Sequence, residues 1–79
     1  NLKRLDLRRC WSLETIEGLP TLPLLRDLDL QGCSKLQELG DLSRFPHLRR
    51  LNLRDCPELE IPKDVQEMGI EEFLHDQDD

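Results

Sequence analysis

The sequence predicts an α/β solenoid of about three and a half coils, in which a short strand and a return segment alternate along the chain. Three observations support this prediction. The chain repeats itself at a regular interval, so that Cys10, Cys33 and Cys56 occupy equivalent positions. Each repeat carries leucines at fixed spacing, and prolines and glycines interrupt the remainder. Self-similarity at a fixed period of about 20 to 50 residues is typical of structures built from stacked units. With 79 residues, the stack forms one domain with a thin core.

The start of each repeat predicts a strand. The pattern L-x-x-L-x-L-x-x-C-x-x-L begins at Leu2, Leu25 and Leu48. In its middle, leucines alternate with polar residues, so the leucines point to one side of an extended strand and the polar residues to the other. About twenty residues join successive strands, and connections of this length predict parallel pairing. Stacking then buries the leucines in one continuous core.

The remainder of each repeat predicts turns. It shows no sustained helical periodicity, and it contains prolines and glycines, which mark turns and loops. Short 3-10 segments are also expected there, whereas full helices are not. The residues that carry this expectation are Pro20, Pro23, Pro46, Pro62, Gly18, Gly40 and Gly69.

The period sets the expected boundaries. Residues 1–74 form the repeat segment and residues 75–79 form an acidic tail. Within the segment, the coils are expected at residues 1–24, 25–47 and 48–69, with a degenerate fourth coil at 70–74.

The two ends of the predicted stack differ. The fourth coil departs from the pattern because His75 stands where the third leucine is expected, and we interpret it as a terminal cap with a polar outer face. At the other end, Leu2, Leu5 and Leu7 are expected to present an open apolar edge. Such an edge predicts either further repeats before Asn1 or self-association.

The segment from Leu28 to Leu39, continued from Asp41 to Leu48, resembles the cysteine-containing leucine-rich repeats of plant nucleotide-binding immune receptors. The resemblance covers residues 1 to about 74. It implies a cytoplasmic protein, with the nucleus as a second compartment, that recognises a protein or restrains a neighbouring nucleotide-binding module. The chain contains no G-x-x-x-x-G-K-[ST], so a nucleotide site is not expected within it.

Two other functions stay open at this point. The segment is alternatively the C-terminal structural cap of a longer solenoid, whose acidic tail docks within the parent chain. By family analogy alone, it is alternatively the substrate-recruiting arm of a ubiquitin ligase.

The three cysteines, Cys10, Cys33 and Cys56, are interpreted as structural thiols. They recur with the period of the repeat and form no close pair such as C-x-x-C, which a metal site needs, so no metal is predicted. In the repeats that the chain resembles, this position points inward and bonds to loop backbone groups. An odd number of reduced thiols also favours a cytosolic protein.

Charge narrows the choice of partner. Residues 1–57 carry ten basic and eight acidic side chains, whereas residues 58–79 carry one basic and nine acidic side chains. Because phosphate binding needs a basic surface, nucleic acid is disfavoured.

No apolar run is long enough to span a membrane. The histidines, His47 and His75, belong to no catalytic constellation, so we predict no enzyme activity, catalytic residue, cofactor or small-molecule substrate.

The predicted partner is therefore a protein or a neighbouring domain of the parent chain. It is expected to contact the polar strand residues on the concave face, which form columns because stacked strands lie about 4.8 Å apart. The column Arg4, Asp27, Arg50, Glu72 alternates in sign, which fits either a solvated ladder of weak ion pairs or a recognition face. Trp11 is either a binding hot spot or a cover for the open edge. The predicted protein-binding residues are Arg4, Asp6, Arg8, Trp11, Asp27, Asp29, Gln31, Arg50, Asn52 and Arg54.

Overall fold

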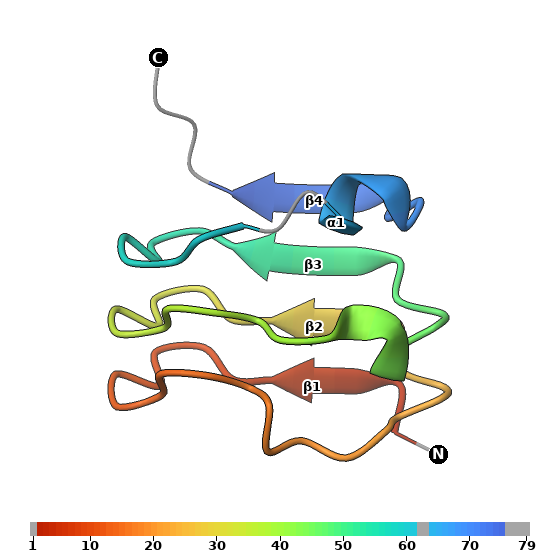
Figure 1. Ribbon diagram of the computed structural model, residues 1–79, viewed down its shortest axis with the longest axis horizontal. Coiled ribbons are helices and arrows are strands. Elements are labelled where there is room, and N and C mark those ends of the chain that lie inside the picture. The colour runs from red at the N-terminus through yellow and green to blue at the C-terminus, as the bar shows by residue number, and fades with distance from the viewer. Residues whose placement is uncertain (1, 62–63, 76–79) are drawn as a thin grey trace.

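The computed structural model describes residues 2–61 and 64–75. Four parallel strands form one open sheet in the order β1-β2-β3-β4 (Figure 1). The described part of the chain contains little helix. The predicted parallel strands are thus confirmed. The expected short 3-10 segment is present at Leu42–Arg44, whereas Asp64–Glu67 forms a single turn of α-helix that the sequence pattern did not predict. The elements are β1 (Arg4–Asp6), β2 (Asp27–Asp29), the 3-10 helix η1 (Leu42–Arg44), β3 (Arg50–Leu53), α1 (Asp64–Glu67) and β4 (Glu72–His75).

The sequence period sets the register of the sheet. Leu5 is aligned with Leu28, and Leu28 with Leu51, so each leucine lies beside its equivalent in the next repeat. A slip by one residue would turn every strand leucine away from the core, so the leucine pattern specifies this register. The ladder also continues beyond the short strands, because the N–H of Leu7 donates to the carbonyl of Asp29 at 2.8 Å.

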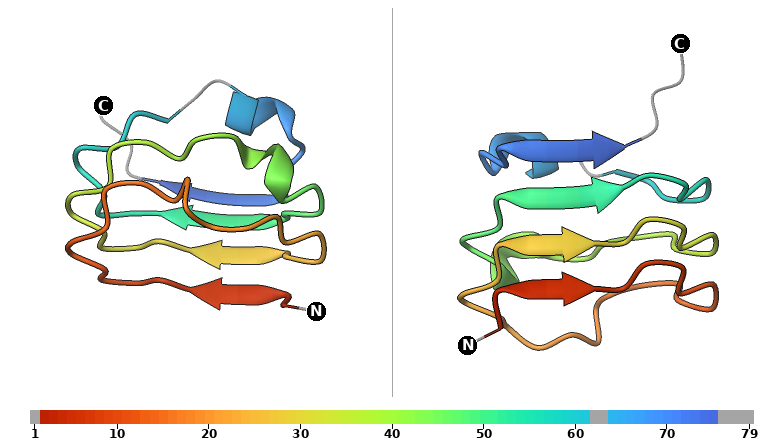
Figure 2. Two further views of the ribbon diagram at one scale, coloured as in Figure 1. Left: turned by 60° about the horizontal axis from the view of Figure 1, so that its bottom comes forward. Right: turned by 180° about the vertical axis from the view of Figure 1, so that it is seen from behind.

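The return segments all lie on one side of the sheet, together with η1 and α1 (Figure 2). The core fills the space between them and the strands. Leu28 and Leu30 enter it from the sheet, Leu39 and Phe45 enter it from the return segment, and each is at most 1% exposed. Burying a side chain of this kind stabilises the fold by about 1.5 to 3 kcal/mol, so these four contribute much of the stability.

The turn at η1 is built by three neighbouring residues. Asp41 precedes it and accepts a hydrogen bond from the N–H of Ser43 at 2.9 Å, which caps the turn. Hydrogen bonding from the Ser43 side chain, together with this backbone contact, lowers the pKa of the Asp41 carboxyl. Phe45 follows the turn and is fully buried, so η1 directs the largest side chain of this return segment into the core.

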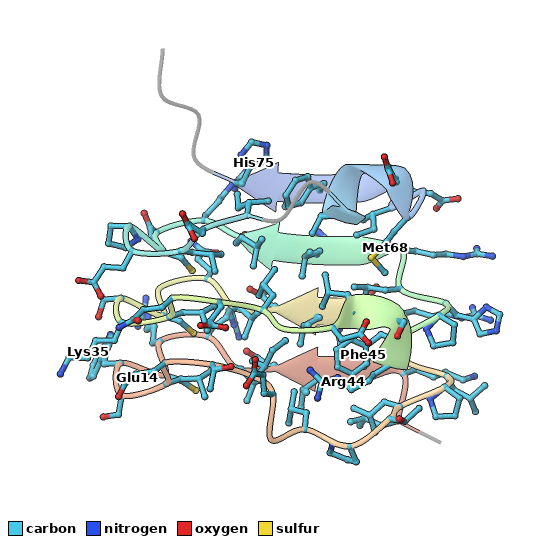
Figure 3. All side chains as sticks on the ribbon, in the orientation of Figure 1. Glu14, Lys35, Arg44, Phe45, Met68 and His75 are labelled. Atoms are coloured by element: carbon cyan, nitrogen blue, oxygen red, sulfur yellow. The ribbon has the colours of Figure 1, made fainter. Side chains whose placement is uncertain are left out.

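Arg44 in η1 joins two return segments. Its guanidinium donates to the carbonyls of Ile16 at 3.1 Å and Glu17 at 3.0 Å, and also to the carbonyl of Leu19. Figure 3 shows Arg44 and Phe45 side by side at the turn, and the guanidinium lies 5.2 Å from the centre of the Phe45 ring. One charged side chain therefore satisfies carbonyl groups that lie 25 to 28 residues away in sequence.

The segment at residues 2–24 is less buried than the equivalent residues further along the chain. Leu5 and Leu7 are half-buried, whereas Leu28 and Leu30, their equivalents in the next repeat, are 1% and 0% exposed. Leu2 is 44% exposed. Within the described residues, no strand pairs with β1 on the side away from β2.

The far end of the sheet is formed by β4. His75 lies within this strand, beside Leu53, so the segment predicted as an acidic tail begins inside the sheet. The ring of His75 lies 4.5 Å from that of Phe73. Residues 76–79 of the predicted tail lie outside the described residues, as does Pro62. None of the described helices is long and apolar enough to cross a membrane.

Candidate protein-binding face

The strand residues that point away from the core form what we call the exposed face of the sheet. Arg4, Asp27, Arg50 and Glu72 lie side by side across it, one from each strand, as the sequence predicts. A shallow hollow of about 240 Å³ lies on this face. It brings together seven of the ten predicted binding residues, namely Arg4, Asp6, Arg8, Asp27, Asp29, Arg50 and Asn52.

Ion pairs connect neighbouring strands on the exposed face. Arg4 Nε lies 3.6 Å from Asp27 Oδ2, and Arg50 Nε lies 2.8 Å from Glu72 Oε2. Arg4, Arg50 and Glu72 are well exposed to solvent and Asp27 is partly exposed, and surface pairs of this kind contribute only about 0 to 1 kcal/mol each. This geometry fits both a solvated ladder of weak ion pairs and a recognition face. Ion pairs this weak can break, and their charged side chains can then pair with charged groups of a partner protein.

Asp6 and Arg8 form the closest ion pair at the end of β1. Arg8 Nη2 and Nε donate to the two carboxylate oxygens of Asp6 at 2.8 and 2.9 Å. Arg8 Nε also lies 3.9 Å from the carboxylate of Asp29. The side-chain hydrogen bond from Arg8 lowers the pKa of Asp6 from 3.8 to about 2, and the same bond raises the pKa of Arg8. Both groups therefore stay charged at neutral pH.

A second column of the exposed face has a structural role that the sequence pattern did not predict. The side-chain oxygens of Asp6, Asp29 and Asn52 each accept the backbone N–H two residues further on, always at 3.1 Å. Aspartate and asparagine stabilise turns in this way. These oxygens therefore hold the chain where each strand ends.

Asn52 is the least accessible of the predicted binding residues. It is 9% exposed, and its amide nitrogen donates to Gln31 Oε1 at 3.1 Å. The side chain thus links β3 to the end of β2 rather than standing free for a partner. Gln31 itself is half-buried and borders a neighbouring hollow, which Arg8 and Arg9 share.

The strand ends turn through a left-handed residue. Arg9, Gly32 and Asp55 stand at equivalent positions and have φ values of 61°, 82° and 59°. Only Gly32 signals this conformation in the sequence, since glycine adopts positive φ without steric cost. Arg9 and Asp55 adopt it in spite of their side chains, so sequence inspection does not find the recurrence.

The thiols lie where the resemblance implies. Cys33 Sγ donates to the carbonyl of Leu7 at 3.2 Å, and Cys56 Sγ donates to the carbonyl of Leu30 at 3.1 Å. In each case the carbonyl belongs to the preceding strand end, so the thiol joins neighbouring repeats. Burial raises the pKa of Cys33. The interpretation of these two cysteines as structural, inward-pointing thiols is confirmed.

Trp11 and Arg54, like Gln31, lie outside the hollow on the exposed face. Trp11 is 65% exposed, so it covers little of the open edge beside β1, and Arg54 is exposed beyond the end of β3. The exposure of Trp11 leaves its indole accessible, as a binding role requires.

A larger and more open hollow of about 860 Å³ lies on the return side, where the sequence analysis predicted no site. The exposed carboxylates of Glu38, Glu58 and Glu60 line it. Glu60 stands at the same repeat position as Glu14 and Gln37, so the period does place it beside Gln37, whereas no repeated polar position indicates Glu38 or Glu58.

A scan against protein-family models gave no match, and searches of curated proteins and of solved structures found no similar protein.

Proposed function

We propose that this chain is a protein–protein interaction module that binds its partner through the exposed face of the sheet. In this proposal it is a short leucine-rich-repeat solenoid and serves as a ligand-recognition or autoregulatory segment of a larger intracellular, plant-type immune receptor. Its compartment is the cytoplasm or the nucleus, and it acts by binding without catalysis. The observation that carries the proposal is the gathering of seven charged or amide side chains, on or just beyond three strands, around one hollow.

The rigidity of this face supports a binding role. The strand ladder and the strand-end turns of Asp6, Asp29 and Asn52 fix the backbone beneath the charged groups. A surface that is already ordered loses little conformational entropy when it binds. The arginines and aspartates then select a partner whose charges are complementary, which affects specificity and association rate more than affinity.

The second candidate is a structural cap of a longer solenoid. The turn at α1 supports it, because Val65 enters the core there and is 1% exposed. The described part of this last unit thus covers the buried leucines of β3. The proposal of a substrate-recruiting arm for a ubiquitin ligase has only the family analogy behind it.

The proposal predicts that reversing charges on the exposed face abolishes binding. In co-precipitation from a plant cytosolic extract, the combined variant Arg8→Glu, Arg50→Glu, Arg54→Glu should lose a protein that the unchanged chain retains. The circular dichroism spectrum should stay the same, because all three side chains are exposed.

A matched control makes the same change in net charge at three exposed residues outside the hollow. The variant Lys3→Glu, Arg26→Glu, Arg49→Glu alters three exposed residues that do not line the hollow, and it should retain the protein. Retention by the first variant, or equal loss by both, would show that the exposed face is not the binding surface.

A further inference from the structure

Three basic residues form a column at the start of the strands. Lys3, Arg26 and Arg49, which we call the basic column, stand at equivalent repeat positions and immediately precede β1, β2 and β3. These three strands begin at the same end of the sheet, one beside the next (Figure 2). All three side chains are exposed, and none lines the hollow of the exposed face. The basic column is therefore a surface that the proposed function leaves unused.

The backbone sets the spacing of the basic column. The carbonyl of Lys3 accepts the N–H of Arg26 at 2.8 Å, and the carbonyl of Arg26 accepts the N–H of Arg49 at 2.9 Å. Each carbonyl also accepts the N–H of the next residue, Asp27 or Arg50, so both steps have the same geometry. Because neighbouring strands lie about 4.8 Å apart, the backbones of the first and third residues are about 9.6 Å apart.

No ion pair neutralises the charges of the basic column within the described residues. There, Arg4, Arg8 and Arg50 on the exposed face each form an ion pair, whereas the residues of the basic column form none. Like charges on neighbouring strands destabilise each other. Glu71, which precedes β4, carries the opposite charge and ends the column after three residues. An anionic partner that lies along the column would relieve this repulsion.

Apolar groups adjoin the basic column. Leu24 lies two residues before Arg26, in the turn that leads into β2, and it is 44% exposed. Pro23 and Pro46, at equivalent positions of two repeats, are also exposed. Proline loses almost no side-chain entropy when it is covered. The start of the strands therefore suits a partner that is acidic along one stripe and apolar beside it.

We infer that the basic column binds an amphipathic α-helix of a partner protein, in which acidic residues stand at positions i, i+4 and i+7. These positions lie on one face of a helix. At 1.5 Å per residue they span about 10.5 Å, which is close to the length of the basic column. An extended segment presents every second residue on one side, so its three carboxylates would span about 13 Å and overrun the column. The inference does not rest on the proposed function, because it uses other residues.

Fluorescence anisotropy of a labelled peptide, titrated with the full chain, tests the inference. The probe is an alanine-based peptide of about 20 residues, long enough to form a helix alone, with glutamates at i, i+4 and i+7 and a leucine beside them. In about 0.1 M salt, charges more than about 10 Å away are screened, so the net charge of -6 on the chain has little effect. The double variant Arg26→Glu, Arg49→Glu should raise the dissociation constant of the peptide at least about tenfold.

The variant Lys35→Glu, Arg54→Glu is the matched control. It makes the same change in net charge at two exposed residues that follow the strands, and Figure 3 shows Lys35 at the opposite end of the molecule from the strand starts. This variant should bind the peptide like the unchanged chain. Circular dichroism checks that both variants keep their fold.

A second peptide of the same composition, with its glutamates distributed around the helix, should bind at least about tenfold more weakly. No binding of the first peptide at millimolar concentration, equal affinity for both peptides, or equal loss in both variants would each overturn the inference. A single-stranded oligonucleotide of the same charge that binds more tightly than the first peptide would overturn it in favour of nucleic acid.

Discussion

Single residues at the strand ends decide how the chain leaves the sheet. At each strand end, a side-chain oxygen of Asp6, Asp29 or Asn52 closes a turn. A left-handed residue follows three positions later, at Arg9, Gly32 or Asp55. Both features recur at the ends of the first three strands, which explains how three segments of different sequence follow the same backbone path.

Gly32 tests the left-handed turn. Gly32→Ala should lower the free energy of unfolding by about 1 to 2 kcal/mol, because L-residues are strained in this region. The added Cβ would also lie 3.3 Å from Cγ of Arg9. Gly18→Ala is the control, since a Cβ there meets nothing within 4 Å, and it should change stability little. Urea denaturation measures both, and equal losses would contradict the explanation.

Asp6 tests the electrostatics of the exposed face. Its pKa is lowered to about 2 in the folded chain, below the usual 3.8. A depressed carboxyl pKa adds stability that is fully present above the usual value and is lost as the pH falls toward the folded one. Arg8→Gln should return the pKa of Asp6 toward 3.8 and remove this part of the acid sensitivity. Carboxyl chemical shifts followed by NMR over this range measure it, and an unchanged midpoint in Arg8→Gln would refute the assignment.

At the scale of elements, the return segments are held together by backbone hydrogen bonds, such as that from the N–H of Gln37 to the carbonyl of Glu14, and by side chains, rather than by helices. Arg44 is the clearest case, because it reaches from η1 to three carbonyls of the preceding return segment. The sheet has its own ladder, and the thiols of Cys33 and Cys56 add contacts between the strand ends.

Replacing Arg44 should therefore loosen the return side. Arg44→Ala leaves the carbonyls of Ile16, Glu17 and Leu19 without their charged donor and should lower the free energy of unfolding by about 2 kcal/mol. Arg26→Ala, at an exposed position, is the control and should change stability by less than about 0.5 kcal/mol. Thermal denaturation distinguishes them, and an Arg44→Ala chain as stable as the control would rule out the proposed contact.

The strands and their register were predictable from the sequence, because they follow from the leucine period alone. The same pattern predicted that Arg4, Asp27, Arg50 and Glu72 share one face. The role of Arg44 was not predictable, since its partners lie 25 to 28 residues away in segments without a repeated pattern. The turns at the strand ends were not predicted, because the polar residues that close them, Asp6, Asp29 and Asn52, were interpreted only as candidates for binding.

At the scale of the whole molecule, one open sheet has two different sides and two different edges. The exposed face carries charged groups on hydrogen-bonded strands, and the return side carries turns and the acidic hollow. Within the described residues β1 and β4 are the two edge strands of the sheet, and the exposed apolar side chains Leu2, Trp11 and Leu24 lie in the first predicted coil. Each surface can therefore meet a different partner, and we propose that recognition uses the exposed face.

Site-specific photo-crosslinking tests that assignment most directly. A photo-reactive amino acid is placed at Gln31, beside the hollow of the exposed face, or at Gln37, an exposed residue on the return side, and each chain is irradiated in plant cytosolic extract. The account predicts a discrete adduct from Gln31, absent from Gln37, that disappears when Arg8, Arg50 and Arg54 are changed to glutamate. An adduct from Gln37 alone, or one from Gln31 that survives the charge reversal, would contradict it.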